Sequence, residues 1–463
     1  MQLDSFHNCR LNLKYILYNN VFGDKIWLGI DDTDSTKGGC TTHIAQTIIK
    51  KFIDEEYIII GYPRLVRLNP NIQWKTRGNG AVSIQIGKRG NKQKKIGKIG
   101  GIDLLSTYEL TQDIEKSDYK IIKSIVRETI EKDARIDDEN TNPGFVILDK
   151  KPDVDFYKKT VREIVSIDET KSLLKSLYAD FKGYKNCRGI IGATAAISWS
   201  PLEDRTYELI SYRQSKKWGT KREVDYKSVI KMDKCCKTTF DNYDYENKHN
   251  RIAPNSPCPI LYGIRGEDVN ELYKALDIVE SEPVESWMIF ETNQGTDDHL
   301  EQKKIEDIQP FQSVIVNGSI VKNPNTIEGG HVIFSIKDQS STIDCAAYEP
   351  TKRFRNIIRN LCVGDIVEVY GSVRHHPLTV NIEKIKVNQL TKILQKIGNP
   401  VCPSCEKHMK SIGRNQGYKC KKCSVKSDKP QLKKKQRLID LGFYEVPVCA
   451  RRHLSKPLKR MST

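Results

Sequence analysis

The stretch KIWLGIDDTDSTKGGCTT, residues 25–42, decides the expected fold of the first part of this chain. It begins with an apolar strand, residues 25–30, and continues into an acidic loop that contains two adjacent glycines. The residues that follow place apolar side chains on one helical face: Ile44, Ala45, Ile48, Ile49, Phe52 and Ile53. The segment therefore predicts a strand, a loop and an amphipathic helix in that order.

The alternation of strands and helices continues to about residue 280. Strands are predicted at residues 57–61, 63–68, 81–86 and 144–148, and helices at residues 118–133 and 167–178. Residues 189–197 are small and apolar enough to form a buried helix. This pattern predicts an α/β or α+β catalytic body at residues 25–280, preceded by an extension, residues 1–24, and followed by a linker, residues 281–310.

Short strands with a period near two begin at residue 311. The predicted strands span residues 313–321, 331–337, 342–348, 365–373 and 378–387, and one predicted helix, residues 351–361, lies between the third and the fourth. This order is typical of an OB-fold, a β-barrel that commonly binds single-stranded nucleic acid, and it predicts such a domain at residues 311–392. The alternative is another small β-barrel with a purely structural role.

Four cysteines near the C-terminus have the spacing of a zinc site. They form two CxxC pairs separated by 14 residues: Cys402, Cys405, Cys420 and Cys423. Four thiolates at this spacing can close a tetrahedral Zn²⁺ site between two turns, which predicts a zinc ribbon at residues 398–428. Lys421 and Lys422 lie between the last two cysteines and are candidate contacts to RNA.

The positive charge of the chain is concentrated at its C-terminal end. The 463 residues carry a net +17, and residues 396–463 contribute +14 of it, with 18 Lys and Arg against 4 Asp and Glu. A nearly neutral body with a cationic C-terminal region predicts a nucleic-acid partner, and residues 429–463 are expected to be a basic tail. A solvated tail without a ligand is the alternative.

Composition also bounds the location of the protein. No run approaches the roughly 20 apolar residues of a membrane helix, and the N-terminal residues do not resemble an export signal. The 13 cysteines are scattered apart from the zinc-site cluster, which favours a reducing compartment over a disulfide framework. We therefore expect a cytoplasmic protein with no membrane partner; no oligomeric state is predicted.

Three carboxylates crowd the loop after the first strand, at Asp31, Asp32 and Asp34. Such groups repel one another unless a hard cation is present, and Mg²⁺ held by one or two carboxylates and phosphate oxygens is the usual solution. Thr41 or Thr42 is expected to cap the following helix, so that its N-terminus faces a phosphate. The alternative is a solvated acidic turn followed by ordinary capping threonines.

A second candidate phosphate site follows a basic strand. It contains Lys75, Arg77, Gly78, Asn79 and Gly80, where cations beside glycines can neutralise and cradle a nucleotide. The alternative is a tight turn, because Arg-Gly-Asn-Gly is also a good turn sequence.

The acidic loop has a rival interpretation. Residues 32–36, DTDST, match the DxDxT start of haloacid-dehalogenase-like phosphotransferases, in which Asp32 would be the nucleophile and Asp34 the acid. Against this interpretation, Asp32 does not directly end the strand, and no convincing lysine and paired-aspartate sequence follows.

Several motifs in order resemble the archaeal 2-agmatinylcytidine synthetase family, which acts on the AUA-decoding isoleucine tRNA. They are GIDDTDS (29–35) with CTT (40–42), PRLVRLNP (63–70), KTRGNGA (75–81), TNPG (141–144), LYGIRG (261–266) and TNQGTD (292–297). The resemblance covers about residues 25–425, and the expected OB-fold and zinc ribbon follow the motifs.

The resemblance implies an ATP-dependent ligase that joins agmatine to C2 of the wobble cytidine in the CAU anticodon, through a phosphorylated C2 oxygen. It implies a multidomain α+β protein whose body combines a kinase-like and a ferredoxin-like domain. By motif match, Asp31, Asp32 and Asp34 would bind Mg²⁺ and ATP. Thr41 would be the autophosphorylated threonine, with Thr42 as the adjacent alternative.

A function without catalysis is the other possibility. A tRNA or single-strand binding protein, with the body as a scaffold, would account for the OB-fold, the ribbon and the charge. It would leave the clustered aspartates without a purpose.

Overall fold

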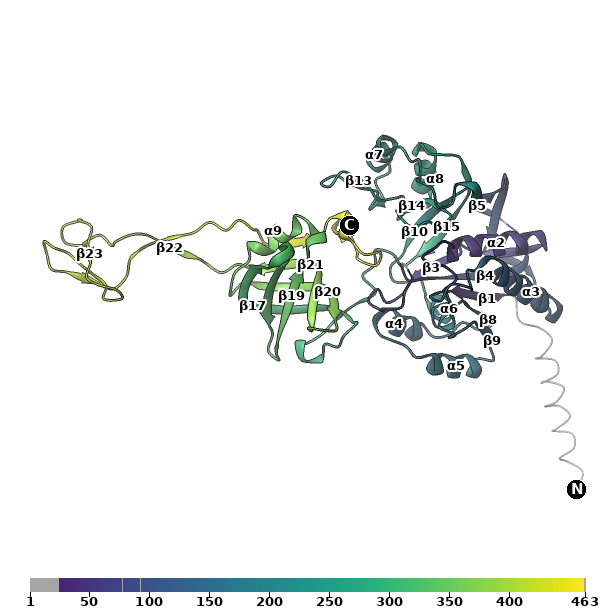
Figure 1. The fold of residues 1–463 in the computed structure, drawn as a ribbon, viewed down its shortest axis with the longest axis horizontal. Coiled ribbons are helices and arrows are strands. Elements are labelled where there is room, and N and C mark those ends of the chain that lie inside the picture. The colour runs from purple at the N-terminus through teal and green to yellow at the C-terminus, as the bar shows by residue number, and fades with distance from the viewer. Residues whose placement is uncertain (1–24, 77, 92, 462–463) are drawn as a thin grey trace, which may run out of the picture.

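The computed structural model describes residues 25–76, 78–91 and 93–461. Three parts follow one another along the longest axis: the body, the β-barrel, and a small ribbon around β23 at the far end (Figure 1). The chain then returns, and the last described residues lie where the barrel meets the body. The predicted extension, residues 1–24, and Arg77 lie outside the described residues.

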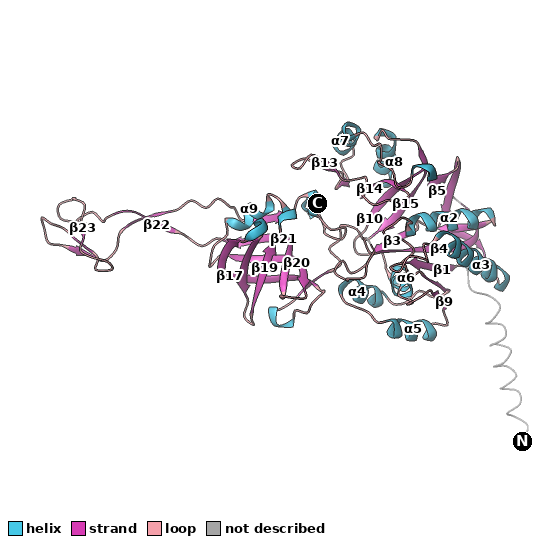
Figure 2. Ribbon diagram, viewed as in Figure 1, coloured by secondary structure: helices cyan, strands magenta, loops and turns pink. Residues whose placement is uncertain are grey.

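The first strand, β1 (Ile26–Asp31), is buried on both of its faces. It pairs antiparallel with β4 (Gly80–Asn91) and β8 (Gly144–Leu148). On one face Ile26, Leu28 and Ile30 join the core formed with α2 (Thr41–Asp54) and α3 (Lys116–Asp133), and on the other Trp27 packs with α6 (Gly189–Ser198). Helices on both faces explain why the strand is apolar without interruption (Figure 2).

The second half of the body extends the same sheet. Its long strands are β10 (Thr206–Arg213), β14 (Ile260–Gly266) and β15 (Val284–Thr292), with α7 (Tyr226–Cys235) and α8 (Val269–Ile278) packed beside them. β3 (Arg64–Arg67) joins the two halves, because it pairs antiparallel with β4 and parallel with β15. The result is one 13-stranded sheet.

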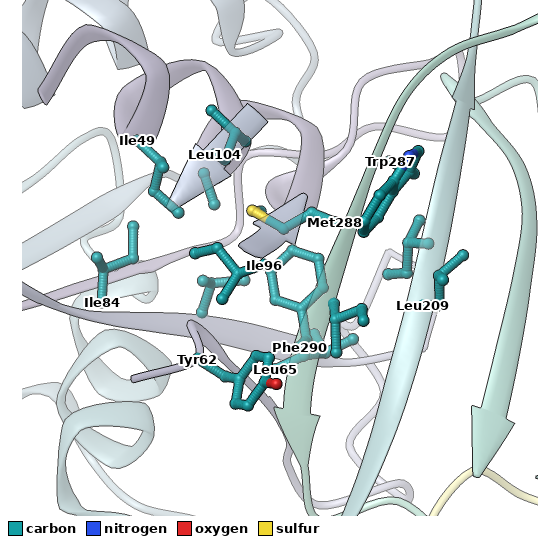
Figure 3. Packing of buried hydrophobic residues seen from close by; sticks show 14 of the residues in the cluster. Ile49, Tyr62, Leu65, Ile84, Ile96, Leu104, Leu209, Trp287, Met288 and Phe290 are labelled. Carbon is teal, nitrogen blue, oxygen red and sulfur yellow. The ribbon is translucent and has the colours of Figure 1, made fainter. Parts of the chain in front are cut away.

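The sheet corrects the predicted linker at residues 281–310. β15 pairs with β10 on one side and with β5 (Lys94–Ile99) on the other, so residues 284–292 belong to the body. Figure 3 shows Trp287, Met288 and Phe290 of this strand among Ile96, Leu65 and other core side chains from both halves. The strand lies inside the sheet because it pairs with strands that are distant in sequence. No local sequence pattern indicates such pairings.

The other elements of the body are short or peripheral. They are β2 (Tyr57–Ile60), β6 (Ile102–Thr107), β7 (Glu109–Gln112), α4 (Val154–Arg162), α5 (Ile167–Ser176), β9 (Asp180–Gly183), β11 (Thr239–Phe240), β12 (Tyr243–Asp244) and β13 (His249–Asn250). In the part of the chain that the structure describes, no helix is long and apolar enough to span a membrane.

The predicted barrel is confirmed strand by strand. Its strands are β17 (Ser313–Thr326), β18 (Val332–Lys337), β19 (Thr342–Ala347), β20 (Ile366–Arg374) and β21 (Thr379–Gln389). The helix α9 (Phe354–Arg359) lies between β19 and β20, and pairing of β17 with both β18 and β20 closes the barrel. The short β16 (Leu300–Gln302) adds to β17 in parallel.

A two-stranded ladder connects the barrel to the distal ribbon. It consists of β22 (Leu394–Gly398) and β26 (Gln431–Lys434), and the ribbon beyond it contains β23 (Lys410–Ser411), β24 (Tyr418–Lys419) and β25 (Lys426–Ser427). Nearly all residues of the ladder are exposed, so this module stands away from the body (Figure 1).

The prediction of a basic tail at residues 429–463 is wrong for the second half of that segment. β27 (Gly442–Glu445) pairs with β21, and residues 446–461, which we call the C-terminal strap, run back to the body and end in α10 (Leu458–Met461). Arg460 is 2.8 Å from Asp204 and 2.9 Å from Glu267, so strap cations neutralise carboxylates of the body. The sequence shows the cations but not the distant acids that pair with them.

Candidate active site and zinc ribbon

A cavity of about 590 Å³ lies where the two halves of the body meet. The acidic loop, the loop at residues 75–80 and the start of α6 line it from the first half. Strands β10 and β14 line it from the second half, and His453 of the strap completes it. The described residues of both predicted nucleotide-binding loops therefore lie at one cavity.

The acidic loop holds its carboxylates in an unfavourable electrostatic environment. Asp31 ends β1, and burial together with the charge of Asp32 raises its pKa well above the usual range. Asp32 has a positive φ of 54°. Burial raises the pKa of Asp32 to about 7, although Arg188, 4.0 Å away, and hydrogen bonds from Asn142 oppose this shift. Added positive charge would stabilise the ionised loop.

Thr141 of the TNPG motif and Gly192 of α6 support this loop from behind. The hydroxyl of Thr141 donates a hydrogen bond of 2.8 Å to the backbone carbonyl of Asp34, and Thr141 is fully buried. Gly192 of α6 leaves room for Asp31, since a Cβ at Gly192 would lie 1.9 Å from Oδ2 of that carboxylate. Contacts within the protein therefore fix the backbone of the loop at Asp34 and the position of the Asp31 carboxylate.

Alanine substitutions at two glycines should separate site geometry from fold. A Cβ at Gly192 meets the ends of two side chains, Asp31 Oδ2 at 1.9 Å and Leu68 Cδ1 at 2.8 Å, and no backbone atom as close, so we expect G192A to fold and to lose most activity. A Cβ at Gly29 would lie 2.1 Å from the backbone oxygen of Ala193, and we expect G29A to lose about 1–3 kcal/mol of stability or more. Thermal unfolding and turnover of both variants test this; equal unfolding losses would contradict it.

The threonines after the loop do not cap the helix as predicted. Cys40 is the N-cap of α2, without a side-chain cap bond, and Thr41 and Thr42 occupy the first turn. The Thr33 hydroxyl donates to Thr41 Oγ1 at 3.0 Å, and the Thr42 hydroxyl lies 3.0 Å from Cys40 Sγ. Both threonines line the cavity, so the start of α2 faces it as expected.

The loop at residues 75–80 approaches the cavity from the side of β3. Lys75, Gly78, Asn79 and Gly80 line the cavity, and Arg77 lies outside the described residues. A Cβ at Gly78 would lie 2.8 Å from a guanidinium nitrogen of Arg67, and Asn79 has a positive φ of 47°. The glycines thus allow cationic side chains to approach the backbone of the loop closely. The same residues also form the tight turn that was the alternative interpretation.

Residues that sequence reasoning did not select complete the cavity. Arg67, Arg188, Glu208, Arg265 and His453 all line it. Arg67 and Arg265 lie 3.7 and 3.5 Å from Glu208, and the Nε atoms of Arg67 and Arg188 have no hydrogen-bond partner among the described residues. Arg67 and Arg265 lie in two of the motifs, and that position could have marked them as site residues. His453 lies in no motif, so nothing in the sequence pointed to it.

His453 is held as a neutral hydrogen-bond donor. Its Nδ1 lies 3.0 Å from a guanidinium nitrogen of Arg265, which can only donate, so Nδ1 accepts and Nε2 carries the proton. Burial and the charges of Arg67 and Arg265 lower the pKa of His453 well below its usual range. Nε2 faces the loop, 3.2 Å from where a Cβ of Gly78 would stand.

The four cysteines of the ribbon converge as predicted. The Sγ atoms of Cys402, Cys405, Cys420 and Cys423 all lie within 4.8 Å of one another. The backbone N–H of Cys423 donates to the Cys420 thiol, which lowers the pKa of that thiol to about 7. Among the described residues no other set of three or more His, Cys, Asp and Glu clusters so tightly, and the carboxylates of the acidic loop do not.

The fold and the site together define a multidomain enzyme with a nucleic-acid-binding module. Domain models match successive parts of the chain: the TiaS TCKD domain at residues 27–186, the TiaS FLD domain at 187–299, an OB-fold nucleic acid binding domain at 314–388 and the TiaS C-terminal zinc ribbon domain at 399–439. The chain belongs to the isoleucine-tRNA 2-agmatinylcytidine synthetase (TiaS) family.

The similarity to individual relatives extends over almost the whole chain. The isoleucine-tRNA 2-agmatinylcytidine synthetase TiaS of Methanocaldococcus jannaschii is 45% identical over 444 residues, which cover 94% of this chain and 98% of that protein. A crystal structure of TiaS in complex with its isoleucine tRNA and ATP is 42% identical with a TM-score of 0.81. A complex of TiaS with the same tRNA, AMPCPP and agmatine is 40% identical with a TM-score of 0.79, and both cover 95% of this chain and 98% of the other.

Proposed function

We propose that this protein joins agmatine to C2 of the wobble cytidine in the CAU anticodon of an isoleucine tRNA, consumes ATP and produces agmatidine. Family membership over nearly the full length supports the proposal, and the synthetase activity for which the relatives are named disfavours both a haloacid-dehalogenase-like phosphotransferase and a non-catalytic tRNA-binding protein. The observation that carries it is the cavity of about 590 Å³, where the acidic loop and a cationic wall face one space.

The chemistry requires both kinds of charge. The C2 oxygen of cytosine is a poor leaving group, so it must first accept a phosphoryl group from ATP. The primary amine of agmatine then attacks C2, the bond from C2 to the phosphorylated oxygen breaks, and phosphate leaves with that oxygen while the amine loses a proton. Negative charge develops on phosphoryl oxygens in the first step and on the leaving phosphate in the second.

The acidic loop is suited to hold Mg²⁺ with the nucleotide. Asp31, Asp32 and Asp34 are crowded at one end of β1, and the carboxylates do not converge into a complete ligand set, which fits a cation that shares its coordination with phosphate oxygens. Bound Mg²⁺ would supply charge neutralisation at the transferring phosphoryl group. In this proposal residues 27–186 act as the kinase-like domain and residues 187–299 as the ferredoxin-like domain.

The cationic side chains that line the cavity are suited to phosphate oxygens. Arg67 and Arg188 each carry a buried Nε–H without a partner among the described residues, and Lys75 lies at the rim. Nε2 of His453 offers a further donor to an anion. These groups would orient the triphosphate and the leaving phosphate, and the loop with Gly78, Asn79 and Gly80 would allow the close approach.

RNA binding is assigned to the modules outside the cavity. The target base must leave the anticodon stack to enter the cavity, so the rest of the tRNA has to be held elsewhere. The OB barrel and the zinc-stabilised ribbon, with exposed Lys421 and Lys422, supply cationic surface outside the cavity. We infer a cytoplasmic enzyme that meets its tRNA through these two modules.

Thr41 is the proposed site of autophosphorylation. Its hydroxyl accepts a hydrogen bond from Thr33 and so keeps its own proton available, whereas the Thr42 hydroxyl is paired with the Cys40 thiol. We expect T41A to suppress phosphate incorporation and reduce activity, and T41S to retain part of both. Phosphopeptide mapping checks this; label on Thr42 alone would move the role by one residue.

ATP turnover tests the overall proposal. Purified protein should consume ATP rapidly only when agmatine and unmodified isoleucine tRNA are both present. Phosphate release should be measured with each component omitted in turn, and with putrescine, which lacks the guanidinium group, as a matched amine. Equal ATP consumption without tRNA would contradict the proposed function.

A further inference from the structure

A second hollow lies beside the catalytic cavity, at the junction of the body and the OB barrel. It measures about 540 Å³. We call it the junction groove; residues 70–73 and 75 of the body, 311, 372–376 and 381 of the barrel, and 452 of the strap line it. The chemistry of agmatine transfer leaves it without a role.

The junction groove is strongly cationic. Lys75, Arg374 and Arg452 bring three cationic side chains to it, of which Arg452 is paired with Glu383 at 3.3 Å, and His375 and His376 add two imidazole rings. None of the described residues that line it is acidic. A concave surface with this charge favours an anion, and a phosphodiester is the anion that a tRNA enzyme meets.

An aromatic platform forms one wall. The rings of Phe311 and His375 stack with centroids 5.7 Å apart and an interplanar angle of 18°. The backbone of Phe311 is fixed, because its N–H donates to the carbonyl of Val373 at 3.1 Å and its carbonyl accepts from the side chain of Asn71 at 3.1 Å. A rigid ring pair beside cations is the arrangement on which single-stranded bases stack.

Two polar side chains at the groove lack partners. Ser372 Oγ and Asn381 Oδ1 are buried and have no hydrogen-bond partner among the described residues. The two residues are opposite each other in the pairing of β20 with β21. Unsatisfied groups of this kind indicate a ligand that offers hydrogen-bonding edges, as a nucleobase does.

The groove and the catalytic cavity are neighbours. Ile72 and Lys75 line both of them, so the two hollows adjoin at the loop that contains these residues. We propose that the junction groove binds a nucleotide adjacent to the target cytidine in the same RNA strand, with its phosphate on Lys75, Arg374 and Arg452 and its base on Phe311 and His375. This inference rests on the proposed tRNA substrate. In it, the RNA strand passes from the cavity into the junction groove.

Binding of labelled tRNA without ATP or agmatine tests the groove separately from the reaction. Unmodified isoleucine tRNA carries a fluorescent base analogue either immediately 5′ or immediately 3′ of the wobble cytidine. We expect wild-type protein to change the emission of one of the two tRNAs. F311L should remove that change and weaken binding about 5- to 150-fold, the range for one lost stacking interaction, while F311Y should retain both.

Charge and surface controls complete the test. R374Q should reduce the slope of log affinity against log salt by about 0.7, the value for one single-strand phosphate contact. The exposed residues Tyr226 and Lys227 on α7 provide the controls Y226A and K227Q, which should bind as wild type. Thermal unfolding confirms that each variant is folded.

Two outcomes overturn the inference. If folded F311L binds tRNA as tightly as wild type, or if emission changes at neither flanking nucleotide, the groove is not the adjacent subsite. These results concern binding only, so a protein that modifies tRNA normally and shows no effect in the groove refutes the subsite and leaves the proposed function standing. A protein that shows the groove effects and never modifies tRNA refutes the function instead.

Discussion

D31N and D34N should each reduce agmatine addition by about a thousandfold or more. Asp31 lies against Gly192 at the end of β1, and both carboxylates line the cavity, so each substitution removes negative charge from the place where we assign Mg²⁺ and the triphosphate. Loss of charge stabilisation at a reacting centre costs about a hundred- to thousandfold for a single group, and loss of the metal costs more.

Binding and turnover have to be measured together for these variants. Affinity for tRNA should stay close to that of wild type, because the acidic loop belongs to neither the barrel nor the ribbon (Figure 1). D137N, at an exposed carboxylate of the same half of the body, is the matched control and should remain active. Near-normal turnover of D31N or D34N at saturating Mg²⁺ would show that the metal assignment is wrong, and a phosphorylated Asp32 would favour the phosphotransferase alternative.

C402S or C420S should release about one zinc per chain and unfold the ribbon. Three thiolates cannot close a tetrahedral site, and the small core around Cys402, Met409, Tyr418 and Cys420 includes two of the ligands themselves. Zinc content and proteolysis of the ribbon measure the effect. C235S, at an exposed cysteine on α7, should retain the metal.

The consequence for RNA binding follows from the charge of the ribbon. Affinity for tRNA should fall in the cysteine variants, and neutralisation of Lys421 and Lys422 should lower the salt dependence by about one unit of slope for each lost phosphate contact. ATP binding to the body should be unchanged. Metal-free protein with full tRNA affinity would leave RNA recognition to the barrel.

Local patterns predicted the elements whose partners are close in sequence. The five barrel strands and α9 follow one another over residues 313–389, and the cysteine pairs fold as two turns of the same small module. The acidic loop was recognisable because unusual carboxylates directly follow a strand. In each case the pattern that identifies the element is contained in residues close to one another in sequence.

Long-range contacts account for what the sequence did not reveal. β15 is central only because β10, β3 and β5 pair with it, and His453 reaches Arg265 across 188 positions in the chain. The strap shows the same limit: Arg460 and Lys456 resemble any solvated basic tail until Asp204 is seen to pair with both. Charge alone does not distinguish a paired cation from a free one.

The most direct measurement of the central claim follows the C2 oxygen itself. Isoleucine tRNA with a heavy-oxygen label at C2 of the wobble cytidine is incubated with the protein, ATP and agmatine, and the anticodon nucleoside and the released phosphate are analysed by mass spectrometry. We expect a nucleoside heavier than cytidine by agmatine minus water, without the label, and heavy oxygen in the phosphate. A wobble cytidine that keeps its labelled oxygen while ATP is consumed would contradict it.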